Sequence, residues 1–298
     1  MGEHPVIWLI GNRGMLGTEL SEALEGTSLP FVGTDREISI LDEAALASFA
    51  EGKKIGWIVN CAAYTAVDKA EDEAGLCGAL NVDGPANLAR LATAIGASFL
   101  HISTDYVFDG NGTVPYDEAN PVCPTGVYGR TKADGEEAAL AACARTVVVR
   151  TAWLYGKHGP NFVATMLRLM KEKDVIGVVA DQRGSPTWAR DLSIAITDIL
   201  RADKTVYGIF HFTDAGETTW HEFAVEIHRL GRKHGLLEKD CAVNALTTAQ
   251  YPTKTRRPPY SVLSKEKIVK AYGVRIPDWQ ESLEAFIRES IPPRHPSP

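Results

Sequence analysis

The stretch "VIWLIGNRGMLG", Val6 to Gly17, joins an apolar segment to a helical pattern through a glycine-rich turn. Its continuous apolar run predicts a strand that is covered on both faces. Glycines at positions 11, 14 and 17 would let backbone N–H groups approach a pyrophosphate at the positive end of the following helix. The plainer alternative is a tight turn that needs glycine only for its backbone conformation. Its place between the first strand and the first helix favours a dinucleotide-binding turn.

The same alternation of strand and helix continues along the chain. Apolar runs recur at "WIVN" (57–60), "SFLHIS" (98–103) and "TVVVRTAW" (146–153), with a helical pattern over residues 79–96. Strand, helix and strand in this order indicate a parallel sheet with helices on both faces. We therefore expect an α/β fold, a Rossmann-type doubly wound parallel sheet with a smaller, discontinuous substrate-binding region.

The pattern loosens after about residue 154, and no Pro/Ser-rich linker marks a domain edge. We expect a dinucleotide-binding domain that consists of residues 1–153, about 176–212 and 243–266. The substrate-binding region would take about 154–175, 213–242 and 267–291. A proline-rich tail over residues 292–298 is expected to be disordered.

Composition limits the classes of partner. The 298 residues carry 31 basic and 38 acidic side chains, a net charge of −7, which does not favour binding to nucleic acid or to an anionic membrane. The sequence has no basic leader and no run of the ~20 apolar residues that a membrane span needs, so we expect a cytoplasmic protein. The five cysteines are scattered, and no histidine has a ligand spacing. The sequence therefore predicts neither a disulfide framework nor a metal site.

Two opposite cues bear on the cofactor. Asp35 ends the second predicted strand, "FVGTD", where a carboxylate can accept hydrogen bonds from an adenosine ribose and repel a 2'-phosphate. Arg36 and Arg13 could instead pair with that phosphate. We therefore expect the chain to accept either NADPH or NADH.

The stretch "VYGRTKADGE", 127–136, places Tyr128 and Lys132 on one face of a predicted helix. An ammonium about 4 Å from a phenol contributes ~4 kcal/mol at a dielectric near 20, a drop of about three pKa units before desolvation is subtracted. The strand "HISTDYVFDG", 101–110, presents Ser103 and Thr104 at its carboxyl end, where ligands of such sheets bind. Tyr-x-x-x-Lys alone is common on surface helices. Together with the glycine turn and Thr104 it predicts proton transfer beside a nicotinamide.

These three elements resemble the extended branch of the short-chain dehydrogenase/reductase superfamily. Six motifs resemble the dTDP-4-dehydrorhamnose reductase family over nearly the whole chain: "STDYVFDG" (103–110), "YGRTKADGE" (128–136), "RTAWLYG" (150–156), "NFV" (161–163), "DQRGSPT" (181–187) and "RRPPYSVL" (256–263). The resemblance implies NAD(P)H-dependent reduction of the 4-keto group of dTDP-4-dehydro-6-deoxy-L-mannose, which gives dTDP-L-rhamnose.

The resemblance also implies roles for single residues. Tyr128 would donate the proton, Lys132 would tune Tyr128 and hold the nicotinamide ribose, and Thr104 would bind the sugar oxygen. The implied cofactor-binding residues are Gly11, Asn12, Arg13, Gly14, Met15, Leu16, Gly17, Asp35, Arg36, Leu41, Asp42, Ala62, Ala63, Tyr64, Thr65, Tyr128 and Lys132. The implied substrate-binding residues are Thr104, Asp105, Tyr106, Trp153, Asn161 and Arg257.

Three of the substrate-binding residues have plainer alternatives. Asp105 could order a polar turn, Trp153 could pack in the core, and Arg257 could be a solvated loop charge rather than a ligand of the diphosphate.

The sequence also bears on the oligomeric state of the protein. Some members of the family form a magnesium-bridged dimer through acidic residues. Here Glu19 and Asp191 are present, but Ala189 and Arg190 stand where an acidic neighbour would be expected. We therefore expect no metal, and a monomer or weak homodimer.

The sequence alone does not exclude two other functions. Nucleotide-sugar epimerases and dehydratases with bound NAD share the glycine turn and the Tyr/Lys pair. A non-catalytic regulatory subunit of methionine adenosyltransferase uses the same scaffold. The motif "DQRGSPT" favours the reductase, and consumption of NADPH would separate the three.

Overall fold

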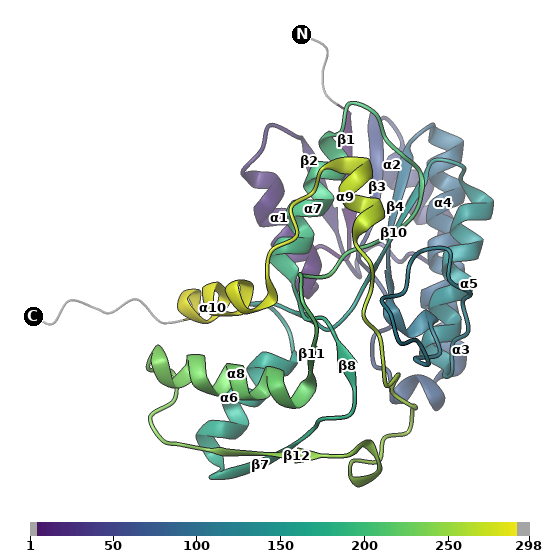
Figure 1. Ribbon diagram of the computed structural model, residues 1–298. Helices are drawn as coiled ribbons and strands as arrows, with labels where there is room; N and C mark the ends of the chain where they lie inside the picture. The colour runs from purple at the N-terminus through teal and green to yellow at the C-terminus, as the bar shows by residue number, and fades with distance from the viewer. Residues whose placement is uncertain (1–4, 291–298) are drawn as a thin grey trace, which may run out of the picture.

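The protein, seen here as a computed structural model, is described over residues 5–290. The expected disordered tail, 292–298, lies outside the described residues. Figure 1 shows a sheet flanked by helices in its upper part and a smaller layer of helices and strands below. Among residues 5–290, every helix is too short or too polar to cross a membrane.

The central sheet is six-stranded and parallel, and its strand order β10-β5-β4-β3-β1-β2 confirms the doubly wound fold. The chain runs from β1 to β2 at one edge of the sheet and then crosses back to β3 on the other side of β1, so the strand order reverses beside β1. Ligands of such sheets bind at the carboxyl ends of the strands beside this reversal. The strands are β1 (Val6–Ile10), β2 (Phe31–Thr34), β3 (Ile55–Asn60), β4 (Ser98–Thr104), β5 (Thr146–Thr151) and β10 (Gly208–His211).

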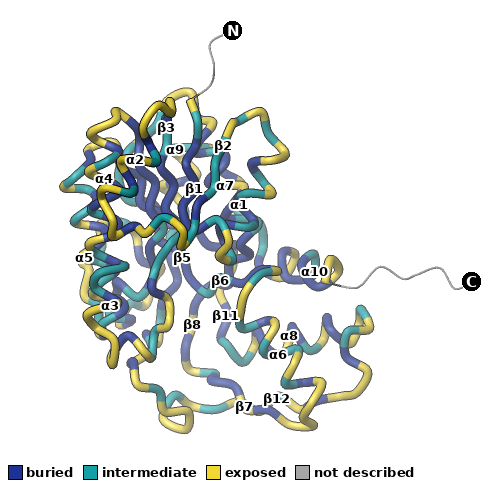
Figure 2. Tube along the Cα trace, turned by 180° about the vertical axis from the view of Figure 1, so that it is seen from behind, coloured by how far each residue is buried: buried dark blue, intermediate teal, exposed yellow. Residues whose placement is uncertain are grey.

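Helices cover both faces of this sheet. On one face α1 packs against α7, and on the other α4 packs against α2 and α5. β1 shows why its sequence is continuously apolar: Ile7 and Leu9 enter the core of one face, while Trp8 and Ile10 enter the core of the other. The strands appear as the buried centre of Figure 2. The flanking helices are α1 (Met15–Glu25), α2 (Glu43–Ala50), α4 (Gly84–Ile95), α5 (Val127–Ala142), α7 (Ala189–Arg201) and α9 (Glu266–Tyr272).

A second hydrophobic core lies below the sheet and forms what we call the small lobe. Its buried side chains include Tyr155, Met170, Phe223 and Phe286. The lobe consists of α6 (Phe162–Glu172), β7 (Val175–Val179), α8 (Trp220–Lys233), β12 (Ala242–Leu246) and α10 (Trp279–Glu289). Two short strand pairs lie between it and the sheet: β6 (Leu154–Tyr155) with β9 (Thr187–Trp188), and β8 (Arg183–Gly184) with β11 (Thr218–Thr219).

The chain passes repeatedly between the sheet and the small lobe, so the two parts are discontinuous. The predicted domain boundaries stay a prediction. Ile176 and Val178 of β7 pack in the small lobe, whereas Ile268 of α9 packs against the central sheet. This packing favours assigning residues 176–179 to the substrate-binding region and 267–274 to the dinucleotide-binding domain.

A close backbone approach holds α5 against the segment before α4. That segment contains α3 (Ala74–Gly78) and a π-helical turn (Ala79–Asp83). A Cβ atom at Gly135 would lie 1.9 Å from the carbonyl oxygen of Asn81. The side chain of Asn81 in turn bonds both backbone groups of Tyr64, at 2.9 and 3.1 Å. Gly135 therefore helps to fix the loop after β3 as well as α5.

We predict that Gly135→Ala destabilises the protein by about 1–3 kcal/mol, because the added methyl group overpacks this contact. Gly78→Ala is the matched control, since a Cβ there meets no atom within 4 Å and the residue is helical. The control should be unchanged or more stable by up to about 1 kcal/mol. Urea unfolding followed by circular dichroism measures both. Equal midpoints for the two variants would contradict the prediction.

Candidate active site

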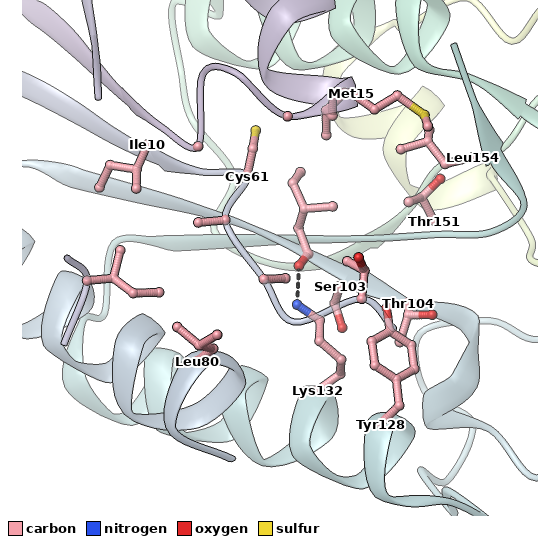
Figure 3. A pocket seen from close by; sticks show the side chains of 18 of the residues that line it. Ile10, Met15, Cys61, Leu80, Ser103, Thr104, Tyr128, Lys132, Thr151 and Leu154 are labelled. Atoms are coloured by element: carbon pink, nitrogen blue, oxygen red, sulfur yellow. Dashed lines mark hydrogen bonds between the residues drawn. The ribbon is translucent and has the colours of Figure 1, made fainter. Parts of the chain in front are cut away.

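A cleft of about 980 Å³ lies at the carboxyl ends of β1, β3, β4 and β5. Figure 3 shows side chains from these strand ends facing Lys132 and Tyr128 of α5. The sheet topology places a ligand site here, because the strand order reverses between β1 and β3. The cleft also reaches Trp153 and Leu154, where the chain leaves β5 for the small lobe.

The glycine turn forms one wall of the cleft. Gly11 has a φ of +76°, and a Cβ there would lie 2.8 Å from the backbone nitrogen of Ala62. A Cβ at Gly17 would lie 2.0 Å from the carbonyl oxygen of Gly11. The first turn of α1 has no acidic residue, and Gly14 provides no side-chain cap. Backbone N–H groups at this helix end are therefore available to an anion, which fits the pyrophosphate of a dinucleotide.

The far end of the cleft holds the residues predicted to distinguish the cofactors. Asp35 and Arg36 both line it. Arg13 lines it too, and its guanidinium lies 3.7 Å from the carboxylate of Glu37 in an exposed pair. Such exposed pairs are worth only ~0.2–1 kcal/mol, so Arg13 can exchange this partner for a phosphate.

Tyr128 stands in the first turn of α5 and is buried. Burial raises the pKa of its phenol, and a hydrogen bond with the Thr104 hydroxyl partly opposes this rise. The ring of Tyr106 packs edge-on against it, with 5.5 Å between the ring centroids. The expected fall in the Tyr128 pKa is therefore wrong for this state of the cleft. The loss of hydration is the largest cause, and the nearby carboxyl of Asp105 raises the pKa further.

Lys132 lies one helical turn after Tyr128 and only 2% of it is exposed. Its ammonium donates to the carbonyl oxygen of Ile102 at 2.6 Å, the dashed line in Figure 3. The same nitrogen lies 3.3 Å from Nε2 of His101. Burial lowers the pKa of Lys132 to about 8, although the carboxylate of Glu136 acts in the opposite direction. Lys132 therefore donates its hydrogen bond to the backbone of β4.

Asp105 directly follows β4 and is almost completely buried. Burial raises the pKa of its carboxyl to about 6, and interactions with the hydroxyls of Ser261 and Thr104 oppose this rise. The Thr104 hydroxyl donates to Oδ1 at 3.0 Å. Its second oxygen, Oδ2, has no hydrogen-bond partner within the described residues. A buried, unpartnered oxygen beside the cleft favours a ligand role over a purely turn-forming one.

Trp153 lines the cleft and has a strained backbone. Its φ of +47° is the only positive value at a non-glycine residue among residues 5–290. Its ring stacks on Trp220 of α8, with ring centroids 3.5 Å apart and planes 10° apart. Strain of this kind is typical of functional sites, where the surroundings hold the residue in place. The contact with Trp220 supplies such surroundings.

Most of the predicted residues come together in this one cleft. Those that line it are Gly11, Arg13, Gly14, Met15, Leu16, Asp35, Arg36, Ala62, Ala63, Thr65, Thr104, Asp105, Tyr106, Tyr128, Lys132 and Trp153. Seven predicted residues are outside its lining: Asn12, Gly17, Leu41, Asp42, Tyr64, Asn161 and Arg257.

Two of these seven cap helices. The carboxylate of Asp42 accepts a hydrogen bond from the backbone nitrogen of Ala45 at the start of α2. The amide oxygen of Asn161 accepts one from Ala164 at the start of α6. These side chains satisfy helix N-termini, which is the usual use of Asp and Asn at such positions.

Three others lie outside the lining for different reasons. The phenol of Tyr64 donates to Glu73 at 2.7 Å. Leu41 is exposed. The side chain of Asn12 packs on Gly33, where a Cβ would lie 2.4 Å from its amide nitrogen.

Arg257 lies in a second cavity of about 930 Å³ that shares Tyr106 with the cleft. Its guanidinium donates to Asp68 at 2.5 Å and to the Tyr106 hydroxyl at 2.9 Å. The cavity also contains cationic and aromatic side chains, including Lys173, Lys254, Phe162 and Trp220.

Several residues that line the cleft were not predicted from the sequence. Cys61 and Thr151 could have been found, because they stand at the carboxyl ends of strands, where the fold places ligands. Ile38, Ser39, Ile40 and Leu80 follow no local motif and are brought in by the loop after β2 and by the π-helical turn.

The comparisons with known proteins agree with this geometry. Residues 6–291 match the family described as "RmlD substrate binding domain". A dTDP-4-dehydrorhamnose reductase of Aggregatibacter actinomycetemcomitans is 40% identical over 93% of this chain and 96% of its own length. One from Streptomyces griseus is 42% identical over 94% and 92%.

Solved structures give the same result. A dTDP-4-dehydrorhamnose reductase from Bacillus anthracis, in complex with NADP, is 34% identical with a TM-score of 0.90, over 97% of this chain and 100% of that one. One from Clostridium acetobutylicum is 39% identical with a TM-score of 0.88, over 95% and 98%. The chain therefore belongs to the dTDP-4-dehydrorhamnose reductase family.

Proposed function

We propose that this chain reduces the 4-keto group of dTDP-4-dehydro-6-deoxy-L-mannose to give dTDP-L-rhamnose, with NADPH or NADH as the reductant. The observation that carries the proposal is the meeting of Tyr128, Thr104 and Lys132 with the glycine turn in one cleft. Family membership supports it, and the Bacillus anthracis relative is in complex with NADP.

The chain's own groups suit the reduction of a ketone. When bound, the nicotinamide supplies a hydride. The hydroxyl of Thr104 and the phenol of Tyr128 lie together. Both can donate to the sugar's 4-oxygen once Thr104 exchanges its bond to Asp105 for that oxygen. Because its pKa is raised, Tyr128 stays protonated at neutral pH and gives up its proton only as negative charge develops on that oxygen. Lys132 would hold the nicotinamide ribose and stabilise the phenolate left behind.

The second cavity suits the nucleoside diphosphate of the substrate. Arg257, Lys173 and Lys254 offer cations for a diphosphate, and Phe162 and Trp220 offer faces for a flat base. Because Tyr106 lines both cavities, one molecule can span them with its sugar in the cleft. This arrangement supports the proposed role of Arg257, which would exchange Asp68 for the phosphates.

The comparisons favour this reaction over the alternatives. Epimerases and a dehydratase among the solved structures are 16–18% identical and share the fold alone. A second candidate substrate has one observation behind it. A relative from Streptomyces antibioticus, a probable dTDP-4,6-dihydroxy-2-methyloxan-3-one 4-ketoreductase, is 40% identical over 97% of the chain. We propose that the reaction takes place in the cytoplasm.

A coupled assay tests the function directly. The 4-keto sugar is made in place from dTDP-glucose, and oxidation of NADPH or NADH is followed by absorbance. We expect turnover with the dTDP sugar and much less with its UDP and GDP analogues. Absence of cofactor oxidation with all three would refute the proposal.

Tyr128→Phe should lower turnover by about 10²-fold or more while cofactor still binds, because it removes a general acid and keeps the ring. Tyr272→Phe is the matched control, since its hydroxyl bonds Val206, away from the cleft. Lys132→Met should weaken both turnover and cofactor affinity. Steady-state kinetics and cofactor titration measure these effects, and near-normal turnover in Tyr128→Phe would exclude this mechanism.

The wild type should discriminate between NADPH and NADH by less than about tenfold in kcat/KM, because Asp35 and Arg36 have opposite preferences. Arg36→Ala should weaken NADPH selectively, since NADH has no 2'-phosphate. Arg90→Ala, an exposed change on α4, is the control. A hundredfold wild-type preference, or equal losses for both cofactors in Arg36→Ala, would show that the two residues do not share the ribose site.

We further propose that assembly does not depend on magnesium. The guanidinium of Arg190 pairs with Glu289, and its Nε lies 4.0 Å from the buried carboxylate of Glu19. A cation thus already faces these carboxylates. Adding a chelator should leave the hydrodynamic radius unchanged in analytical gel filtration. A dimer that dissociates on chelation and re-forms with magnesium would contradict this.

A further inference from the structure

Behind Lys132 lie two buried polar side chains that the proposed mechanism does not use. Asn60 ends β3 and His101 lies opposite it on β4. Both are 0% exposed. The amide nitrogen of Asn60 is 3.1 Å from Nδ1 of His101, and Nε2 of the same ring is 3.3 Å from Nζ of Lys132. The three side chains form a continuous polar chain that ends at the cleft.

The backbone fixes the orientation of the Asn60 amide. The N–H of Ala62 donates to Oδ1 of Asn60 at 3.0 Å. A backbone N–H can only donate, so the amide oxygen must face Ala62 and the NH₂ group must face His101. Nδ1 of His101 therefore accepts a hydrogen bond and carries no proton.

It follows that His101 carries its proton on Nε2. The ring is neutral, because burial and the charge of Lys132 lower its pKa well below the ordinary value. A neutral imidazole has one N–H, and Nδ1 is already an acceptor. The Nε2–H group thus points at the nitrogen of Lys132. A neutral amine can accept that hydrogen bond, whereas an ammonium has no lone pair to do so.

The Ile102 carbonyl and the acidic groups around Lys132 do not stabilise the neutral amine in this way. The carbonyl of Ile102 accepts an N–H from the amine and from the ammonium alike. Glu136, on the same helix, favours the ammonium, as would ionisation of Cys61 after β3 or Cys77 on α3. Glu136 is itself paired with a buried Arg150. Among Glu136, Cys61, Cys77 and His101, only His101 directs a hydrogen-bond donor at the lysine nitrogen.

We propose that Asn60 and His101 are positioning residues that act together with burial on the protonation of Lys132, and so on the alkaline limit of the reaction, by directing an imidazole N–H at the lysine nitrogen. The proposal rests on the proposed function of Lys132 as an ammonium in catalysis. The proton that Lys132 loses leaves for the cleft. Because the pKa of Lys132 is about 8, its charge is lost as the pH rises through that value, and activity falls with it.

Asn60→Asp tests the proposal with a side chain of the same shape. One carboxylate oxygen still accepts from Ala62, and the other accepts from Nδ1–H, so the proton of His101 moves from Nε2 to Nδ1. Nε2 then accepts a hydrogen bond from the ammonium. The alkaline limit of kcat/KM should rise by about one pH unit or more.

The added negative charge needs its own control. The same Asn60→Asp change in a His101→Leu background introduces the charge without the imidazole. We expect less than half of the pH shift there. Shifts of equal size in both backgrounds would show that charge alone accounts for the effect, and would overturn the proposal.

The tautomer can also be observed directly in the wild-type protein. In ¹⁵N-labelled samples the His101 ring is identified by the loss of its signals in His101→Leu. We expect the proton on Nε2, and in Asn60→Asp on Nδ1. A wild-type ring protonated on Nδ1 would refute the proposal. No substrate is needed, so failure of the proposed reductase activity and failure of this arrangement are separate results.

Discussion

The buried ion pair between Glu136 and Arg150 is the interaction on which the site depends. Both side chains are almost fully buried, and the Arg150 guanidinium makes three hydrogen bonds to the carboxylate, at 2.6, 2.9 and 3.1 Å. Ser103 of β4 donates to the same carboxylate, and His211 of β10 lies 3.4 Å from the guanidinium. Burying two charges is costly, and removing either partner would cost about 3–5 kcal/mol. The network fixes α5 over β4 and β5, and so places Tyr128 and Lys132, which lie on the same helix, at the ends of these strands.

A second constraint comes from the path of the chain between the sheet and the small lobe. Trp153 turns the chain out of β5 in a left-handed conformation, which costs of order 1–3 kcal/mol. The neighbouring Gly184 makes room for its ring, since a Cβ there would lie 2.6 Å from it. Stacking on Trp220 then holds the indole in the lining of the cleft. The strain thus has a structural use, because it brings one residue to a cleft shared by both parts of the molecule.

Local patterns explain which features could be predicted from the sequence. The strand, glycine turn and helix at residues 6–25 are short-range, and the position of Thr104 follows from the rule that ligands bind at strand ends. Asp42 and Asn161 were assigned to ligands because a helix cap and a ligand contact require the same residue types. The pairing of Arg257 with Asp68 spans 189 positions, so no local signal could show it. The extent of burial could not be predicted from the sequence. For this reason the predicted fall in the Tyr128 pKa had the wrong direction.

The two pKa shifts in the cleft share one cause and together suit a proton donor. Burial disfavours every charged form, so Tyr128 holds its proton more tightly and Lys132 less tightly than in water. Below about pH 8 the cleft therefore contains a neutral phenol beside an ammonium, which is the state that a ketone reduction requires. If Tyr128 donates the proton as proposed, the phenolate would form near an ammonium in a poorly hydrated site, where attraction between charges is strong. The same burial that makes Tyr128 a weak acid at rest would then increase the stabilisation available from Lys132 during the proposed reaction.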